Sequence, residues 1–295
     1  MRAAVLGSPV GHSLSPALHR AAYAELGLDG WSYEAIECDE ARLAGLLGSL
    51  DDSWAGLSLT MPLKRAVIAL LDAVTPLASR VGAVNTVVFR GGGDVAGDGL
   101  AGSGGDGTPR DRVMHGYNTD VGGIVDALAA CGAAVPASAL IIGGGATACS
   151  ALAAMRDIGL RNVTVAVRST ARAGDLLAAA GRLGISVHLT GVESVGDPGG
   201  ARGELVISTV PSGAADQLTG RFGTLTPAAM LDVVYDPWPT KLAAAAQEAG
   251  ATIIGGFDLL LYQAARQVRL MTGLEPPVQV MRTAGLAVLA QRPAG

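Results

Sequence analysis

The sequence is poor in cysteine, in aromatic residues and in charge. It contains three cysteines in 295 residues, while aromatic residues make up 4% and charged residues 16% of the chain. Cys38, Cys131 and Cys149 lie far apart, form no CxxC pair and are odd in number. A disulfide framework or a zinc site is therefore not expected, and we interpret the three residues as buried free thiols. No metal is expected at the functional site.

Long apolar runs and an excess of positive charge are missing as well. No apolar run approaches the roughly 20 residues that cross a bilayer, and Gly7, Ser8 and Pro9 interrupt the apolar start before a signal peptide could form. The net charge of −5 argues against nucleic acid or an anionic membrane as the main partner. We expect a cytoplasmic protein that binds a small molecule, as a monomer or a homodimer.

Small residues and short aliphatic runs dominate instead, and predicted strands and helices alternate over residues 136–254. The predicted strands are 140–142, 163–167, 185–189, 205–209, 231–234 and 252–254. This alternation is typical of right-handed βαβ units that form a parallel sheet with helices on both faces. We expect an α/β protein of two domains, one of them a doubly wound, Rossmann-type domain that binds a dinucleotide.

The first of these strands runs into a glycine-rich turn. Gly143, Gly144, Gly145 and Ala146 follow the strand and precede an alanine-rich stretch with helical spacing. Glycine lets the backbone turn sharply and approach a ligand, and the N–H groups of a helix N-terminus bind an anion, most naturally a pyrophosphate. By itself, the pattern Gly-x-Gly-x-x-Ala fits a plain turn between strand and helix as well.

The end of the second strand indicates which dinucleotide is bound. A carboxylate roughly twenty residues past the glycines usually binds a free ribose 2′-hydroxyl. This chain has Arg168, Ser169 and Arg172 there instead. Two arginines with hydroxyl groups between them suit a phosphate, which favours NADP. The alternative is that both arginines are solvated charges at the start of a helix.

Two serines stand near the N-terminus, after a predicted strand over 3–6. Ser13 and Ser15 lie in a turn-rich segment, with Ser15 predicted as the N-cap and Pro16 as the first residue of a helix. Two hydroxyl groups at a positive helix end suit a small carboxylate, but they also suit simple capping. The neighbouring histidines, His12 and His19, have no acidic partner at the spacing of a metal site or a triad, and we assign them no catalytic role.

Three further stretches carry polar residues at the ends of predicted elements. Lys64 follows a predicted strand over 57–60 that Pro62 ends, and it lies at the start of the next helix. A positive charge is unfavourable at this positive end of a helix, and functional sites often show such local inconsistencies. Asn85 lies in a β-branched run over 81–89 that we interpret as a strand, and there its side chain either satisfies buried backbone or faces a ligand. Asp120 opens a helix. A surface lysine and an acidic residue favoured by the helix dipole remain open alternatives.

The remaining segments divide the chain. Residues 91–112 are rich in glycine and almost free of apolar residues, which indicates a flexible excursion with no assignable function. A domain boundary fits near Asp120. The stretch 256–263 leads into a helix, and a final helix is predicted over 277–290. This end of the chain is apolar enough to return and pack on the first domain, with Gln263 as an amide among apolar residues.

Several stretches taken together resemble the shikimate dehydrogenase family. They are 7–10, 12–16 with His19, 60–64, 82–86, 118–120, 232–235 with Pro237 and Thr240, and 256–263. Each is weak alone, and their order and spacing over residues 5–283 make the resemblance specific.

The resemblance implies a reversible, NADPH-dependent reduction of 3-dehydroshikimate to shikimate, a step of chorismate and aromatic amino acid biosynthesis. It implies a substrate-binding domain of residues 1–118 and 256–295 and an NADP-binding domain of residues 119–255. It also implies that Lys64 and Asp120 are the catalytic pair. The substrate-binding residues would be Ser13 and Ser15 at the carboxylate, with Thr60, Asn85, Tyr235 and Gln263 around the ring and its hydroxyls.

The same resemblance assigns the cofactor-binding residues. Gly143, Gly144, Gly145 and Ala146 would form the dinucleotide turn. Arg168 and Arg172, with Ser169 between them, would bind the 2′-phosphate, and Gly256 would approach the nicotinamide closely. Two alternatives stay open: a quinate or aminoshikimate dehydrogenase of the same superfamily, and a catalytically silent NADP-binding sensor. The presence of both Lys64 and Asp120 argues against the sensor.

Overall fold

A computed structural model describes residues 1–91, 112–132 and 135–292. Apart from its two end residues, the glycine-rich segment predicted to be flexible lies outside the described residues. The chain divides into two compact units. The first comprises Met1–Thr119 and the end of the chain from Gln263, and the second comprises Asp120–Tyr262.

The first unit contains a six-stranded mixed sheet with the strand order β2-β1-β3-β5-β6-β4. Its strands are β1 (Arg2–Gly7), β2 (Ser32–Glu37), β3 (Trp54–Leu59), β4 (Ala73–Val74), β5 (Thr86–Gly91) and β6 (Arg112–Tyr117). Strand β1 is parallel to both β2 and β3, whereas β5 is antiparallel to β3 and β6. The parallel pairs bring the carboxyl ends of β1, β2 and β3 to one edge of the sheet.

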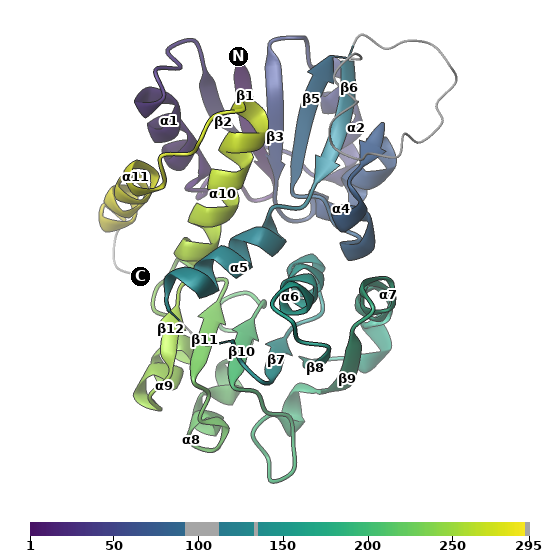
Figure 1. Ribbon diagram of the computed structural model, residues 1–295, viewed down its shortest axis with the longest axis vertical. Helices are drawn as coiled ribbons and strands as arrows, with labels where there is room; N and C mark the ends of the chain where they lie inside the picture. Colours follow the sequence, from purple (N-terminus) through teal and green to yellow (C-terminus); the bar gives the residue numbers. More distant parts are fainter. Residues whose placement is uncertain (92–111, 133–134, 293–295) are drawn as a thin grey trace. The chain divides into compact units, whose positions relative to one another are not determined.

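Helices cover both faces of this sheet (Figure 1). They are α1 (Ser15–Glu25), α2 (Glu40–Ser49), α3 (Leu63–Ala66), α4 (Pro76–Val81), α10 (Gly256–Thr272) and α11 (Val278–Ala290). Successive residues of β1 point to opposite faces of the sheet. Ala4 belongs to one hydrophobic cluster with Leu43 of α2, whereas Val5 belongs to another with Tyr23 of α1 and Met271 of α10. Helix α11 packs against α1. The prediction that the end of the chain returns to the first part is confirmed.

Two local predictions in this unit are wrong. Ser15 is the first residue of α1, and the N-cap is Leu14, which makes no side-chain cap bond. The run 81–89 is not one strand, because Val81 ends α4, Gly82 caps that helix at φ +72°, and β5 begins only at Thr86. A β-branched residue such as Val81 tolerates a helix when packing favours it, which overrides its preference for strands.

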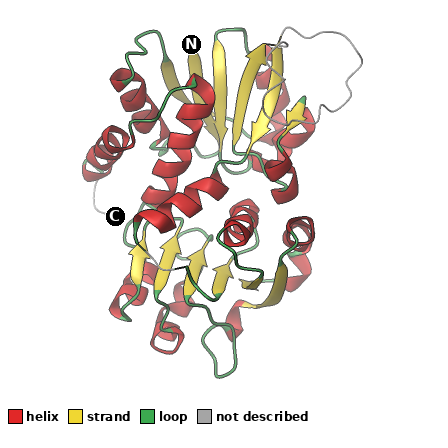
Figure 2. Cartoon of the chain, in the orientation of Figure 1, coloured by secondary structure: helices red, strands yellow, loops and turns green. Residues whose placement is uncertain are grey.

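The second unit contains a six-stranded parallel sheet with the order β12-β11-β10-β7-β8-β9. Its strands are β7 (Ala139–Ile142), β8 (Asn162–Val167), β9 (Ser186–Gly191), β10 (Leu205–Ser208), β11 (Ala229–Asp232) and β12 (Thr252–Ile254). Its helices are α5 (Asp120–Ala130), α6 (Ala146–Asp157), α7 (Gly174–Leu183), α8 (Phe222–Leu225) and α9 (Lys241–Glu248). Helices lie on both faces of the sheet (Figures 1 and 2). The predicted doubly wound fold is confirmed.

The strand order of the second sheet locates its ligand edge. The chain moves outward from β7 through β8 to β9, and then restarts on the other side of β7 with β10. In open α/β sheets, ligands bind beyond the carboxyl ends of the strands at the point where the order reverses. Here that point lies between β7 and β10, next to the glycine-rich turn.

Two further observations on the described residues concern membrane-spanning helices and the cysteines. None of the helices in the described part of the chain is both long and apolar enough to cross a membrane. All three cysteines are free thiols. Cys38 and Cys149 are buried, whereas Cys131 is only partly covered.

Candidate active site

Asn85 lies at the centre of a buried polar cluster in the first unit. Its side chain is 1% exposed and lies just before β5. The backbone N–H of Thr119 donates to Asn85 Oδ1 at 2.8 Å. Asn85 Nδ2 in turn donates to Thr119 Oγ1 at 2.9 Å and to Gln263 Oε1 at 3.3 Å. Because a backbone N–H can only donate, the Thr119 contact fixes which end of the Asn85 amide is the oxygen.

Lys64 and Asp120 are attached to neighbours of this cluster. Lys64 is half-buried in α3, and its carbonyl oxygen accepts from the N–H of Val84, the residue before Asn85, at 2.8 Å. Asp120 is 5% exposed and follows Thr119 directly as the first residue of α5. The backbone thus connects each predicted catalytic residue to a residue that flanks or contacts Asn85.

Ser13, Ser15 and Thr60 follow the carboxyl ends of neighbouring parallel strands. Thr60 is half-buried after β3, and its N–H donates to Leu6 O of β1 at 2.9 Å. Ser15 is buried, with 3% of its surface exposed. Ser13 Oγ accepts from the Ser15 N–H at 3.2 Å. Ser13, rather than the predicted Ser15, therefore provides the hydroxyl group that accepts from the start of α1.

A second buried polar group contacts the cluster through Gln267; sequence reasoning named its His19 without a role and missed Gln267. His19 is fully buried, and its ring stacks on Tyr33 with 3.9 Å between centroids. Burial lowers the pKa of His19 to about 3, against a smaller opposing effect of its hydrogen bond with Gln267. Burial also raises the pKa of the Tyr23 and Tyr33 hydroxyls. The sequence signal for Gln267 was its spacing, four residues after Gln263 on the same helix.

In the second unit, the glycine-rich turn has the geometry of an anion site. Gly143 follows β7 with φ +117°, a conformation that favours glycine, and a Cβ there would overlap the Thr209 hydroxyl. Gly145 is the N-cap of α6 and makes no side-chain cap bond. The first-turn N–H groups of α6, which begins at Ala146, are therefore the donors that this helix end offers to an anion.

The turn is held against the neighbouring strands. The Gly143 N–H donates to Ala166 O of β8 at 2.9 Å, and Thr209 Oγ1, after β10, donates to Ile142 O at 2.9 Å. A Cβ on Gly144 would lie 3.2 Å from Val167 Cγ1, so the turn passes close to the end of β8. These contacts place the predicted dinucleotide turn at the point where the strand order reverses.

Arg168, Ser169 and Arg172 lie beyond the carboxyl end of β8, the strand next to β7. Arg168 and Ser169 directly follow the strand, and Arg172 ends a 3-10 helix over Thr170–Arg172. All three side chains are exposed. Two guanidinium groups at this edge, next to the glycine-rich turn, fit a cofactor that carries a phosphate on its ribose.

Tyr235 is positioned by a buried carboxylate at the end of β11. Asp232 is 2% exposed, and it accepts from Thr240 Oγ1 at 2.7 Å and from the Val234 N–H at 3.2 Å. Burial raises the pKa of Asp232, and the Thr240 hydrogen bond opposes that rise. Tyr235 is half-buried in the loop that Asp232 and Thr240 bridge. Sequence reasoning matched Asp232 and Thr240 to a motif without giving them a role.

Gly256 meets the same loop from the start of α10. Its N–H donates to Val234 O at 3.2 Å. A Cβ at position 256 would overlap the carbonyl group of Val233, and this neighbour is backbone that cannot turn aside. Glycine is therefore required here by the closeness of two backbone segments.

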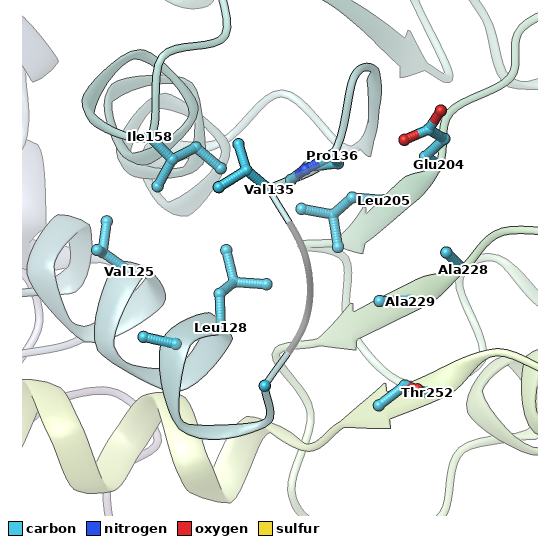
Figure 3. Close-up of a pocket in the computed structure, with 12 residues that line it drawn as sticks. Val125, Leu128, Val135, Pro136, Ile158, Glu204, Leu205, Ala228, Ala229 and Thr252 are labelled. Carbon is cyan, nitrogen blue, oxygen red and sulfur yellow. The ribbon is translucent and has the colours of Figure 1, made fainter.

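An apolar cavity of about 440 Å³ lies elsewhere in the second unit (Figure 3). Its wall includes Leu205, Ala229 and Thr252, the first residues of β10, β11 and β12, together with Val125 and Leu128 of α5. It therefore opens at the amino ends of the strands, away from the edge that carries the glycine-rich turn. Of the described residues that line it, none is predicted for catalysis or cofactor binding.

Two family models match this chain. One is described as the shikimate dehydrogenase substrate binding domain and matches residues 5–87. The other is described as the shikimate 5'-dehydrogenase C-terminal domain and matches residues 256–284. Both matched segments belong to the predicted substrate-binding domain.

Curated relatives and solved structures match over nearly the whole chain. Shikimate dehydrogenases (NADP(+)) from Thermus thermophilus and Moorella thermoacetica are 36% and 35% identical, covering 98% and 94% of this chain and 99% and 90% of theirs. The Mycobacterium tuberculosis shikimate dehydrogenase structure is 37% identical with a TM-score of 0.79, covering 97% of this chain and 99% of that one. A Thermus thermophilus structure in complex with NADP(H) and shikimate is 32% identical with a TM-score of 0.77 and the same coverage. The chain belongs to the shikimate dehydrogenase family.

Proposed function

We propose that this protein catalyses the reversible, NADPH-dependent reduction of 3-dehydroshikimate to shikimate in aromatic amino acid biosynthesis. The observation that carries the proposal is the match to shikimate dehydrogenases (NADP(+)) over almost the full length of both chains. A related structure at 32% identity holds both NADP(H) and shikimate. The cytoplasmic location and the monomeric or homodimeric state remain predictions.

Substrate binding is assigned to residues 1–118 and 256–295, and cofactor binding to residues 119–255. The hydroxyl groups of Ser13 and Ser15 would donate hydrogen bonds to the substrate carboxylate. The remaining substrate-binding residues would surround the ring: Thr60, Asn85, Tyr235 and Gln263. Burial of Asn85 and Gln263 supports this role, since a buried amide left unpaired by a wrong substrate costs about 1 to 3 kcal/mol.

Lys64 and Asp120 would carry the proton chemistry. When hydride reaches the ketone carbon, the electron pair of the C=O bond moves to oxygen, and an adjacent ammonium stabilises that charge and donates a proton. Lys64 provides the ammonium group. Asp120 would orient it and accept a hydrogen bond from the hydroxyl group that forms. In the direction of oxidation, the same two groups would take the proton back.

The residues of the second unit fit NADP. NADPH, when bound, supplies the hydride, and the protein contributes position, charge and exclusion of water. Gly143, Gly144, Gly145 and Ala146 would bind the pyrophosphate through backbone N–H groups. Arg168 and Arg172, with Ser169, would bind the 2′-phosphate, and Gly256 would lie close to the nicotinamide. The positive φ of Gly143 and the exposed guanidinium groups support this assignment.

Steady-state kinetics in both directions test the proposal. Shikimate and quinate are each compared with NADP and with NAD under the same conditions. The expected result is the highest kcat/KM for shikimate with NADP. A clear preference for quinate with NAD would assign the chain to the other branch of the superfamily, and no turnover of any pair would favour a sensor.

A further inference from the structure

Gln267 links the cluster around Asn85 to the buried side chains beneath it. It is 1% exposed on α10. Its Oε1 accepts from Ser58 Oγ at 2.8 Å and from His19 Nε2 at 3.2 Å. Its Nε2 donates to Thr86 Oγ1 at 3.0 Å and to the carbonyl oxygen of Asn85 at 3.4 Å. Both ends of this one amide are therefore engaged, each with two partners.

The direction of every hydrogen bond around Gln267 is determined. The Asn85 carbonyl can only accept, so the Gln267 NH₂ group must face it. Gln267 Oε1 can only accept, so the Ser58 hydroxyl donates to it, and Ser58 accepts from the Tyr33 hydroxyl at 2.6 Å. For the same reason His19 donates through Nε2, which leaves Nδ1 to accept from the Tyr23 hydroxyl at 3.4 Å.

The hydrogen bonds of Gln267 also connect, through the Thr86 hydroxyl, to the side-chain amide of Asn85. Thr86 Oγ1 accepts from Gln267 and donates to Asn85 Oδ1 at 2.9 Å, which is shorter than its 3.2 Å contact with Thr119 Oγ1. That oxygen also accepts from the Thr119 N–H. Asn85 Nδ2 is therefore turned toward Gln263 Oε1, and this contact fixes which end of the Gln263 amide is the acceptor.

We propose that Gln267 is a positioning residue, which holds the amides of Asn85 and Gln263 in one orientation for recognition of the substrate's ring hydroxyls. The proposal rests on the proposed function, because it takes those two amides as substrate-binding groups. Gln267 itself is 1% exposed, and its amide is engaged by groups of the protein at both ends. It acts through the Thr86 hydroxyl and the Asn85 carbonyl, and it is anchored by Ser58 and His19.

The side chains that hold the Gln267 oxygen can fix its orientation because the rings around them are tightly packed. The His19 and Tyr33 rings are nearly parallel, at 15° between planes, and Tyr23 lies edge-on to His19. His19, Tyr23 and Tyr33 are each 2% exposed or less. Side chains packed in this way hold few alternative rotamers, so they fix the Gln267 amide better than solvent would.

The first test replaces Gln267 with a side chain of similar shape that cannot hydrogen-bond in the same way. Gln267→Met should raise KM for shikimate about 10- to 100-fold, because the amides it positions can then turn. KM for NADP should change less than about twofold, since the hydrogen bonds of Gln267 go to Ser58, His19, Thr86 and Asn85 and to no residue assigned to the cofactor. Gln279→Met, the same change at an exposed position of the first unit on α11, is the matched control and should leave both constants unchanged.

A second variant separates positioning from support of the fold. In Gln267→Glu, the ionised carboxyl has no hydrogen to donate to Thr86 or to the Asn85 carbonyl, whereas the protonated carboxyl has one. kcat/KM for shikimate should therefore rise as pH falls through the pKa of the introduced carboxyl. The wild type and Gln279→Met should lack this rise, with circular dichroism verifying that each protein stays folded.

A third measurement does not depend on activity. Hydrogen exchange of the Asn85 and Gln263 side-chain amides, followed by NMR without ligand, should become at least about tenfold faster in Gln267→Met and stay unchanged in Gln279→Met. Failure of the wild type to oxidise shikimate with NADP would overturn the proposed function, and the exchange rates would still decide the positioning role. Unchanged exchange, an unaltered pH profile in Gln267→Glu, or a fall in kcat with both KM values unchanged would overturn that role.

Discussion

The buried histidine beneath the cluster makes stability depend on pH in a way that can be calculated. Burial lowers the pKa of His19 to about 3, whereas an unfolded histidine titrates near 6.5. Between these values the unfolded chain binds a proton that the folded protein does not. Protons therefore favour unfolding, and His19 makes the folded state less stable as pH falls from about 6.5 toward 3.

The magnitude follows from the width of that window. One proton corresponds to about 1.4 kcal/mol per pH unit, so lowering pH from about 6.5 to 4.5 should remove roughly 2 to 3 kcal/mol of unfolding free energy through His19. The ring contacts Tyr23, Tyr33 and Gln267, and none of these is charged in this range, because burial raises the pKa of both tyrosine hydroxyls. These three contacts therefore supply no charge that could offset the loss.

The assay compares the wild type with His19→Gln, which keeps an N–H donor but cannot titrate. Urea unfolding at several pH values between 7 and 4.5 gives the free energy of each protein. The excess stability of the wild type should shrink by roughly 2 to 3 kcal/mol over this range. His12→Gln, at an exposed position, is the matched control for loss of an imidazole. A difference between wild type and His19→Gln that stays constant with pH would refute the reasoning.

Three further predictions concern the remaining parts of the site. Lys64→Met should lower kcat about 10²- to 10⁴-fold while shikimate binding, measured by calorimetry, changes far less. Arg168→Ala should raise KM for NADP about tenfold or more and leave KM for NAD nearly unchanged in steady-state assays, since only NADP carries the 2′-phosphate. Thr240→Val should lower the unfolding free energy by about 1 to 3 kcal/mol in urea titrations, because the buried Asp232 loses a donor and α9 loses its N-cap.

The parts of this protein that the sequence predicts are those whose signals are local. The glycine-rich turn and the strands around it were predictable because a short apolar run, three glycines and an alanine-rich helix follow one another directly. The two wrong predictions were also local. Thr75 and Pro76 are a cap and a first-turn proline, and these two signals for helix α4 were outweighed by the β-branched residues after Val81.

The cluster around Asn85 could not be predicted in the same way, because its members lie far apart in the chain. Asn85 meets Gln263 across 178 residues, and Ser58 meets Gln267 across 209. No periodicity connects such pairs, and only the resemblance to a family brought Asn85 and Gln263 together. Gln267 and the Ser58 hydroxyl that it contacts belong to no short functional motif. The only sequence signal for Gln267 was its spacing of four residues from Gln263.

The cluster around Asn85 fixes the orientation of its side chains through uncharged groups. A buried charge would need a partner of opposite sign, and its field would act on Lys64 and Asp120 as well. Hydroxyl groups, amides and a neutral imidazole avoid this, and they can still impose a direction on one another because some of them only donate and others only accept. The Thr119 N–H can only donate and the Asn85 carbonyl can only accept, so these two backbone groups fix the orientation of the Asn85 and Gln267 amides. Gln267 hydrogen-bonds to Ser58 through its oxygen and to the Asn85 carbonyl through its nitrogen. A change that preserves its volume but removes its polarity should therefore alter recognition before it alters the fold.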